Sequence, residues 1–263
     1  MIFATYLMTF NQDKWIMRNL ENAYPHVDQI YVMHSKLPWG YKSDAREKYT
    51  NKFDINIIEN SPYADKITLI EGDWLNDTDQ RTNCLKIAKK DGVDYLMVHD
   101  ADEFYFHDDF DKLVNLVKND TQHDVFAINL YAFWKSFKYV LIDPQKGRIG
   151  GTNQTIINLH KVDHYDYIRD VHSNNILIVP DIMQYHGSYV LTDEEVYEKI
   201  NSTSHSNDYD GEKWYKEVWL PWTLESKNLH PIWPWCWDHC EIFGQPLPEV
   251  IKDFDIVNKL DKI

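Results

Sequence analysis

Short apolar runs and stretches of helical periodicity alternate along the first half of the chain. The runs with the length of buried strands are 2–8, 29–33, 67–70 and 95–99. Between them, Asp13–Ala23 and about 78–90 carry apolar residues at helical spacing. Alternating strands and helices predict an α/β fold with parallel strands, and they place a ligand crevice at the carboxyl ends of those strands.

The second half of the chain has a different pattern. Its apolar runs are 124–134, 139–142, 155–159, 176–179 and 183–185. Few helical stretches separate these runs, so we expect antiparallel or mixed strands there. Thr192 and Glu195 form a capping box, which predicts a helix from this point to about Ser202.

Aromatic residues dominate the chain from Ser204 onward, and six of the ten tryptophans lie between Trp214 and Trp237. We therefore expect a mixed, mainly parallel central sheet flanked by helices, followed by an aromatic-rich helical segment. The predicted organisation is a main domain over 1–200, with halves 1–123 and 124–200, and a segment over 201–263 docked on it.

The net negative charge of the chain limits which molecules it is expected to bind. The 263 residues contain 42 acids and 27 Lys and Arg, a net charge of −15. Nucleic acid is thereby disfavoured as a partner, because Lys and Arg must neutralise its phosphates. Three cysteines and the lack of a signal-like or membrane-spanning run favour a cytoplasmic protein without stable membrane insertion. The oligomeric state is not indicated.

Three carboxylates follow the apolar run at 95–99: Asp100, Asp102 and Glu103. Carboxylates this close repel one another, and a bound cation would keep all of them ionised. Mg²⁺ and Mn²⁺ prefer oxygen ligands and leave positions for phosphate oxygens. The cluster therefore predicts a site for a metal-bound diphosphate, with a solvated acidic turn as the alternative.

An ordered set of motifs surrounds this cluster. It comprises Thr9 and Asn11, then Arg81 and Asn83, then Asp100-Ala-Asp102-Glu103-Phe104, then Val171-His172, and last His186-Gly-Ser-Tyr-Val. In order and approximate spacing, the set resembles the nucleotide-sugar glycosyltransferases of the GT-A fold, in particular family-two-like enzymes. The resemblance covers residues 1–200. It implies that 1–123 holds the nucleotide sugar and 124–200 holds the acceptor.

The resemblance implies a role for each matching residue. Asp102 would bind the divalent metal, and Asp100 would contact the ribose or the metal. Arg81 and Asn83 would lie near the donor, with Arg81 approaching the diphosphate. Thr9, Asn11 and Ser35 stand where such enzymes hold the nucleobase, although an acidic residue is common at the positions of Asn11 and Ser35. His172 or His186 would complete the coordination of the metal.

The implied reaction is metal-dependent transfer of a sugar from a nucleoside-diphosphate sugar to an acceptor hydroxyl, by inversion. Inversion needs a carboxylate that takes the proton of the acceptor. Asp170 is the candidate, although related sequences often carry an acid where this chain has Ser173. A nucleotidyltransferase and a non-catalytic carbohydrate-binding protein are the alternatives. A glycan is the favoured class of acceptor.

Two histidines and one stretch of the sequence each have more than one interpretation. Each of His172 and His186 is as compatible with packing as with metal binding. The stretch His230–Cys240 contains two cysteines and two histidines, but it lacks the spacing of common zinc sites. Packing in an aromatic tail is the simpler interpretation of this stretch. A further interpretation is that Trp233, Trp235 and Trp237 offer flat faces to a sugar or a base.

Overall fold

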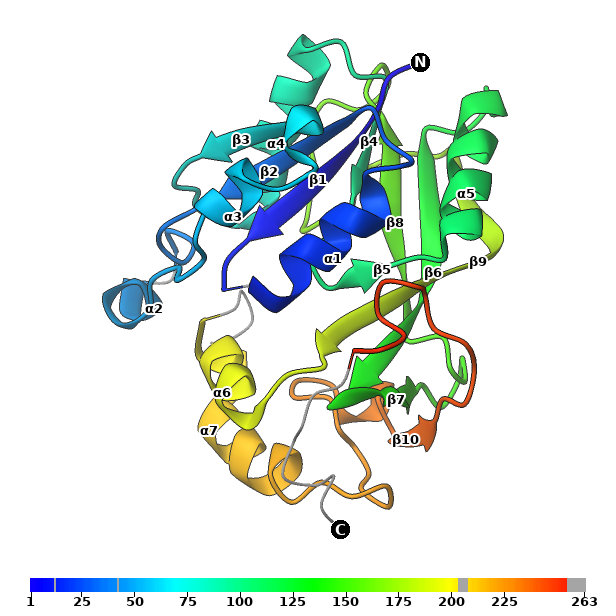
Figure 1. The fold of residues 1–263 in the computed structure, drawn as a ribbon. Helices are drawn as coiled ribbons and strands as arrows, with labels where there is room; N and C mark the ends of the chain where they lie inside the picture. Colours follow the sequence, from blue (N-terminus) through cyan, green and yellow to red (C-terminus); the bar gives the residue numbers. More distant parts are fainter. Residues whose placement is uncertain (12, 42, 203–207, 255–263) are drawn as a thin grey trace.

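The computed structural model describes residues 1–11, 13–41, 43–202 and 208–254, and it contains a ten-stranded sheet with helices on both faces (Figure 1). The strands are β1 (Phe3–Thr9), β2 (Gln29–His34), β3 (Ile67–Glu71), β4 (Tyr95–Val98), β5 (Glu103–Phe104), β6 (Val125–Trp134), β7 (Ser136–Ile142), β8 (Gly151–Asn158), β9 (Ile176–Tyr189) and β10 (His239–Ile242). The helices are α1 (Asp13–Ala23), α2 (Ser43–Lys48), α3 (Asn56–Glu59), α4 (Asp77–Lys90), α5 (His107–Asn119), α6 (Asp193–Ser202) and α7 (Gly211–Trp214), with 3₁₀ turns η1 (Ala64–Lys66) and η3 (Pro234–Cys236) and a π-helical turn η2 (Tyr215–Trp219).

The order of the strands is β10-β7-β6-β8-β4-β1-β2-β3, and β9 pairs with both β5 and β6. Parallel pairing joins β3, β2, β1 and β4, and it also joins β6 to β9. The other pairs, such as β4 with β8 and β6 with β7, are antiparallel. The predicted mixed α/β class is confirmed, with the parallel strands in the first half and mainly antiparallel pairing in the second.

The central strands are buried on both faces. In β1, Phe3 and Leu7 belong to one hydrophobic cluster, whereas Ala4 and Tyr6 belong to another. Helices α1 and α5 pack in the first cluster and α4 packs in the second, so the helices cover opposite faces of the sheet (Figure 1). This burial explains the continuous apolar runs in the sequence, because both faces of a parallel strand exclude water.

Strand β9 is longer than the sequence indicated. The two runs at 176–179 and 183–185 are parts of one strand, Ile176–Tyr189. Asp181, with a φ of 60°, lies where its pairing with β6 shifts register. Pro180 and Asp181 therefore mark a bulge inside a strand rather than a turn between two strands. The bulge keeps the strand continuous as far as His186 and Tyr189.

Helix α6 begins at the predicted capping box. The amide of Thr192 donates to Oε2 of Glu195 at 2.7 Å, and the amide of Glu195 donates to Oγ1 of Thr192 at 3.2 Å. These two hydrogen bonds satisfy amides that the first turn of a helix leaves unpaired. The predicted helix is confirmed.

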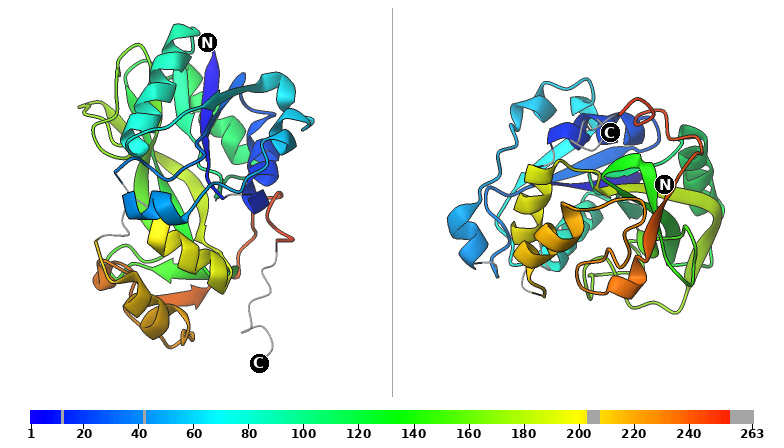
Figure 2. Two further views of the ribbon diagram at one scale, coloured as in Figure 1. Left: turned by 90° about the vertical axis from the view of Figure 1, so that its left-hand side faces the viewer. Right: turned by 90° about the horizontal axis from the view of Figure 1, so that it is seen from below.

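The aromatic-rich segment beyond α6 contributes to the sheet as well as packing against it. Its tryptophans Trp214, Trp219 and Trp222 form a third hydrophobic cluster with Trp134 of β6. Strand β10 pairs with β7, so this segment contains an edge strand and is not purely helical. Figure 2 shows α7 and β10, which belong to this segment, at the end of the molecule opposite the N-terminus. Among the described residues, no helix is long and apolar enough to cross a membrane.

Candidate functional site

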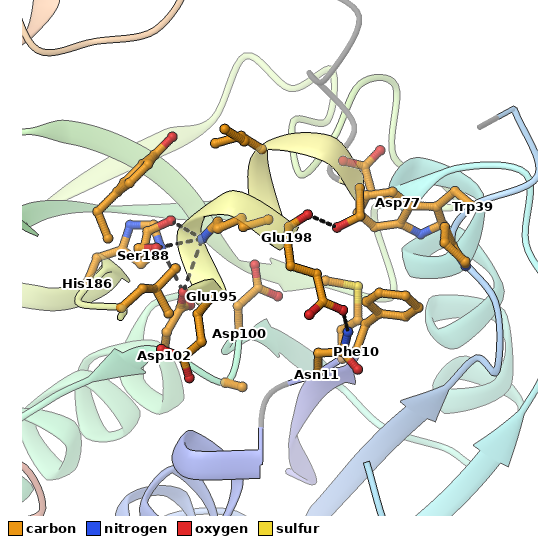
Figure 3. A pocket seen from close by; sticks show the side chains of 18 of the residues that line it. Phe10, Asn11, Trp39, Asp77, Asp100, Asp102, His186, Ser188, Glu195 and Glu198 are labelled. Atoms are coloured by element: carbon orange, nitrogen blue, oxygen red, sulfur yellow. Dashed lines mark hydrogen bonds and ion pairs between the residues drawn. The ribbon is translucent and has the colours of Figure 1, made fainter. Parts of the chain in front are cut away.

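A cavity of about 420 Å³ lies at the carboxyl ends of β1, β2 and β4. Its walls include seven of the residues singled out in the sequence: Thr9, Asn11, Ser35, Arg81, Asp100, Asp102 and His186. In Figure 3, Asp102 and His186 lie on one side of the cavity, Asn11 and Trp39 lie on the other, and Asp100 lies between them. The crevice that the strand order predicts therefore exists, with most of the candidate residues around it.

Asp100 is held by two buried arginines. Nη2 of Arg81 lies 3.0 Å from its Oδ2, and Nη2 of Arg169 lies 2.6 Å from the same oxygen. Burial opposes ionisation of Asp100, but the two guanidinium charges together outweigh it and hold the pKa of this carboxyl below its usual value. The positive charge that the sequence assigned to a metal is thus supplied, for Asp100, by the protein itself.

Asp102 has different partners. Nε2 of His186 lies 3.5 Å from its Oδ1, and Nζ of Lys199 lies 4.0 Å from its Oδ2. Burial works against its charge, but His186 and then Lys199 depress the pKa of Asp102 well below its usual range. Burial would lower the pKa of His186, whereas Asp102 raises it and dominates. The pair is favoured in the form with a carboxylate and an imidazolium.

Strand pairing produces the contact between Asp102 and His186. β5 pairs with β9 so that Glu103 lies opposite His186. The amide of Gly187 donates to the carbonyl of Asp102 at 2.7 Å. A Cβ on Gly187 would lie 3.1 Å from the ring of Phe137 on β7, so the packing of this ring against the backbone of β9 favours glycine here.

Glu103 and Arg169 anchor the acidic loop. Oε1 of Glu103 accepts from Nη2 of Arg169 at 2.8 Å, and Oε2 accepts the amide of Asp100 at 3.0 Å. Glu103 is fully buried, and this desolvation raises the pKa of its carboxyl. Its contacts correspond to the anchoring of a loop rather than to contact with a ligand.

The three residues expected at the nucleobase are already bonded within the protein. Oγ1 of Thr9 lies 2.9 Å from Nδ1 of His34, and Oγ of Ser35 donates to the carbonyl of Leu37. Nδ2 of Asn11 donates to Oε1 of Glu198 at 2.8 Å. These side chains shape the wall of the cavity, and Asn11 connects the end of β1 to α6.

Three candidates from the sequence do not line the cavity. Asn83 is half-buried on α4, outside the lining. Asp170 is exposed, and its backbone forms a bridge with Tyr167. His172 is exposed, and its amide donates to Asp166. The loop around residue 170 turns these side chains outward because Arg169, not Asp170, is the residue that it buries against the acidic cluster.

Two cationic residues of the site were missed in the sequence. Arg169 stands one position before the residue selected as the base, and nothing in the local pattern distinguishes the two. Lys199 lies on α6, where its Nζ donates to the carbonyl and the hydroxyl of Ser188 at 2.6 and 2.7 Å. The capping box predicts this helix but not its position over the cavity.

The described residues contain no group of three or more His, Cys, Asp or Glu side chains that could hold a metal. Asp102 and His186 both line the cavity and adjoin each other. In the stretch considered for zinc, Nδ1 of His230 accepts backbone amides and His239 pairs with Asp238. Those contacts fit the packing interpretation of that stretch.

No family model matches the sequence, and no curated protein matches it. Solved structures resemble the fold at low identity. A mannosyltransferase from Pyrobaculum calidifontis, in complex with GDP-Man and Mn²⁺, is 14% identical with a TM-score of 0.42; the match covers 74% of this chain and 60% of that one. A 4-diphosphocytidyl-2C-methyl-D-erythritol synthase from Anaerococcus prevotii is 13% identical with a TM-score of 0.42, covering 72% and 89% of the two chains. Similarity at this level shows nothing about the activity of this chain.

Proposed function

We propose that the chain is a metal-dependent glycosyltransferase that moves a sugar from a nucleoside-diphosphate sugar to an acceptor hydroxyl. The observation that carries the proposal is the set of charges in the cavity. Asp102 adjoins His186, and Asp100 adjoins Arg81 and Arg169, and all five residues line the cavity at the carboxyl ends of β1, β2 and β4. A carboxylate and an imidazole beside two guanidinium groups suit a ligand that is both metal-bound and anionic.

The donor atoms fit a divalent ion that is only partly held by protein. Mg²⁺ commonly binds through one or two carboxylates and takes its other ligands from phosphate and water. Asp102, together with His186 once its imidazolium has released a proton, would hold Mn²⁺ or Mg²⁺ in this way, and Asp100 would lie beside them. The ion would stabilise the negative charge that grows on the diphosphate leaving group.

Two arginines can balance the negative charge of the diphosphate that the metal leaves uncompensated. Arg81 and Arg169 are only 3% and 8% exposed, and both line the cavity. Arg81 Nε and Arg169 Nη1 have no hydrogen-bond partner among the described residues. A guanidinium group in a dry site interacts strongly with phosphate oxygens. A diphosphate over Asp102 would direct the nucleobase across the cavity toward Asn11 (Figure 3), and Thr9 and Ser35 line the same cavity.

The test is a panel of nucleoside diphosphates and nucleotide sugars, each measured with and without Mn²⁺ by thermal unfolding. A cognate donor stabilises the folded state by mass action. At a free donor concentration of about 100 times its Kd, the free energy of unfolding rises by about 2.7 kcal/mol. Product analysis then separates the reactions. Release of a nucleoside diphosphate supports glycosyl transfer, whereas release of pyrophosphate from a nucleoside triphosphate would indicate a nucleotidyltransferase. The absence of any metal-dependent stabilisation would refute the proposal.

A further inference from the structure

An aromatic strip leads out of the cavity along the segment before β10. The strip consists of Trp237, His230 and Trp233. The ring centroids of Trp237 and His230 lie 4.3 Å apart, and those of His230 and Trp233 lie 5.3 Å apart with near-parallel planes. Trp237 and His230 line the cavity, whereas Trp233 does not. The strip therefore connects the cavity to the surface of the protein.

The outer end of the strip exposes tryptophan to solvent. Trp233 is 47% exposed, and Trp235 in the same turn is 67% exposed. Trp214, Trp219 and Trp222, from the same aromatic-rich segment, are buried. An aromatic side chain that stays exposed does not contribute the free energy that its burial would provide. Exposed aromatic surface beside a cavity is therefore a common mark of a binding site.

Backbone contacts fix the strip in place. Nδ1 of His230 accepts the amides of Ile232 and Trp233 at 3.1 and 3.0 Å. The amide of Leu229 donates to the carbonyl of Trp237 at 2.8 Å, just before β10 joins the sheet. A surface that is already ordered loses little entropy on binding a ligand.

We propose that this strip, with Trp235 beside it, binds the carbohydrate acceptor and leads its hydroxyl toward Asp102 and His186. Flat aromatic faces pack against the C–H face of a sugar ring, and the carboxylates that line the cavity accept hydrogen bonds from hydroxyl groups. Nucleic acid fits this face poorly, because the protein carries a net charge of −15. The term acceptor rests on the proposed function; the carbohydrate site itself does not.

The experiment measures binding of the full chain to immobilised oligosaccharides of mannose, glucose, galactose and xylose, with no donor present. Single-stranded DNA is the competing probe. We expect wild type to bind at least one oligosaccharide class and Trp233→Ala to bind it about tenfold more weakly or worse, as for a central aromatic contact. Trp233→Phe should keep most of the affinity, because it retains an aromatic face.

Ile242→Ala is the matched control, since Ile242 is 64% exposed, lies on the neighbouring β10 and does not line the cavity. Its binding should equal that of wild type. Thermal unfolding of each variant excludes loss of the fold, and donor hydrolysis without acceptor should show an unchanged KM for the nucleotide sugar. Failure of wild type to bind any oligosaccharide, unchanged binding by Trp233→Ala, or preference for DNA would overturn the inference. Carbohydrate binding that depends on Trp233 without any turnover of a nucleotide sugar would refute only the proposed activity.

Discussion

Asp100 and Asp102 are two residues apart, but different partners balance their charges. Asp100 is paired with Arg81 and Arg169, which come from α4 and from the loop before β9. Asp102 is paired with His186 and faces Lys199. Repulsion between the carboxylates therefore does not require a metal, and the case for one rests on the donors at Asp102 and His186. The two aspartates should respond differently to substitution.

Replacing Asp102 with Ala should abolish metal-dependent donor binding and reduce sugar transfer about 100-fold or more, because the leaving group loses its main charge stabilisation. The measurements are titration with Mn²⁺ in the presence of a nucleoside diphosphate, and the rate of transfer. Asp108→Ala is the control, since Asp108 is an exposed acid in the first turn of α5. Full activity of Asp102→Ala in the presence of a chelator would contradict the assignment.

Asp170 provides a test of the resemblance itself. Its motif position implies a catalytic base, but its side chain is exposed and outside the cavity. We expect Asp170→Asn to change the turnover number by no more than about twofold, as for an ordinary surface substitution. Steady-state rates at saturating donor and acceptor give the answer. A loss of 100-fold with unchanged donor affinity would restore Asp170 as the base.

The sequence predicts the parts of the site that follow directly from strand ends. Thr9, Asp100 and Asp102 follow apolar runs, so the topology alone brings them to one edge of the sheet. Arg169 and Lys199 reach the cavity from a loop and from a helix whose positions depend on long-range packing. No local pattern encodes that packing, and these residues could not be distinguished from other surface-like Arg and Lys residues.

At the scale of elements, the junction of β6 and β7 contains a buried lysine. Lys135 has a φ of 60° and is 3% exposed. Its Nζ lies 4.0 Å from the ring centroid of Trp219 and 3.6 Å from Oδ1 of Asp193. Burial lowers the pKa of Lys135 from 10.5 to about 8, although Asp193 partly opposes this shift. The junction, α6 and the π-helical turn therefore meet at one titratable group.

This pKa predicts a stability that depends on pH. Between pH 8 and 10.5 the unfolded chain binds the proton of Lys135 more tightly than the folded chain, so the free energy of unfolding should rise with pH, by up to about 3 kcal/mol. The free energy of unfolding is measured by urea titration at several pH values for wild type and for Lys135→Met, which has no amine to titrate. The difference between the two slopes of this free energy against pH is the contribution of Lys135. Lys138→Met, on β7, is the control. Equal slopes for wild type and Lys135→Met would disprove the shift.

Strands β1 to β4 and helix α6 could be predicted because each is a local pattern. Strands β1, β2, β3 and β4 are apolar runs bounded by polar residues, and α6 has its capping box. Strand β9 could not be predicted at its full length, because Pro180 and Asp181 are typical turn residues. Pairing with β6 on both sides of that point outweighs the local preference. The short β10 likewise depends on its partner β7.

At the scale of the whole molecule, the question is whether the aromatic-rich segment unfolds separately from the rest. Domains that dock through a surface can open independently. Here β10 extends the sheet, and the tryptophans of the segment surround Trp134 of β6. A shared sheet and a shared cluster make a single cooperative unit the physical expectation, although the sequence pattern suggested an appended segment.

A pair of substitutions in this segment distinguishes the two cases. Trp219 is fully buried, so Trp219→Ala should lower the free energy of unfolding by about 3–5 kcal/mol, whereas Trp235→Ala, at 67% exposure, should change it by about 0.5 kcal/mol or less. In one cooperative unit, Trp219→Ala weakens hydrogen-exchange protection equally in β1 and β10, because both exchange through global unfolding. In a separately unfolding segment, protection falls in β10 and is unchanged in β1. Amide exchange followed by mass spectrometry measures both strands at once, and unchanged protection in β1 would show that the segment is a separate unit.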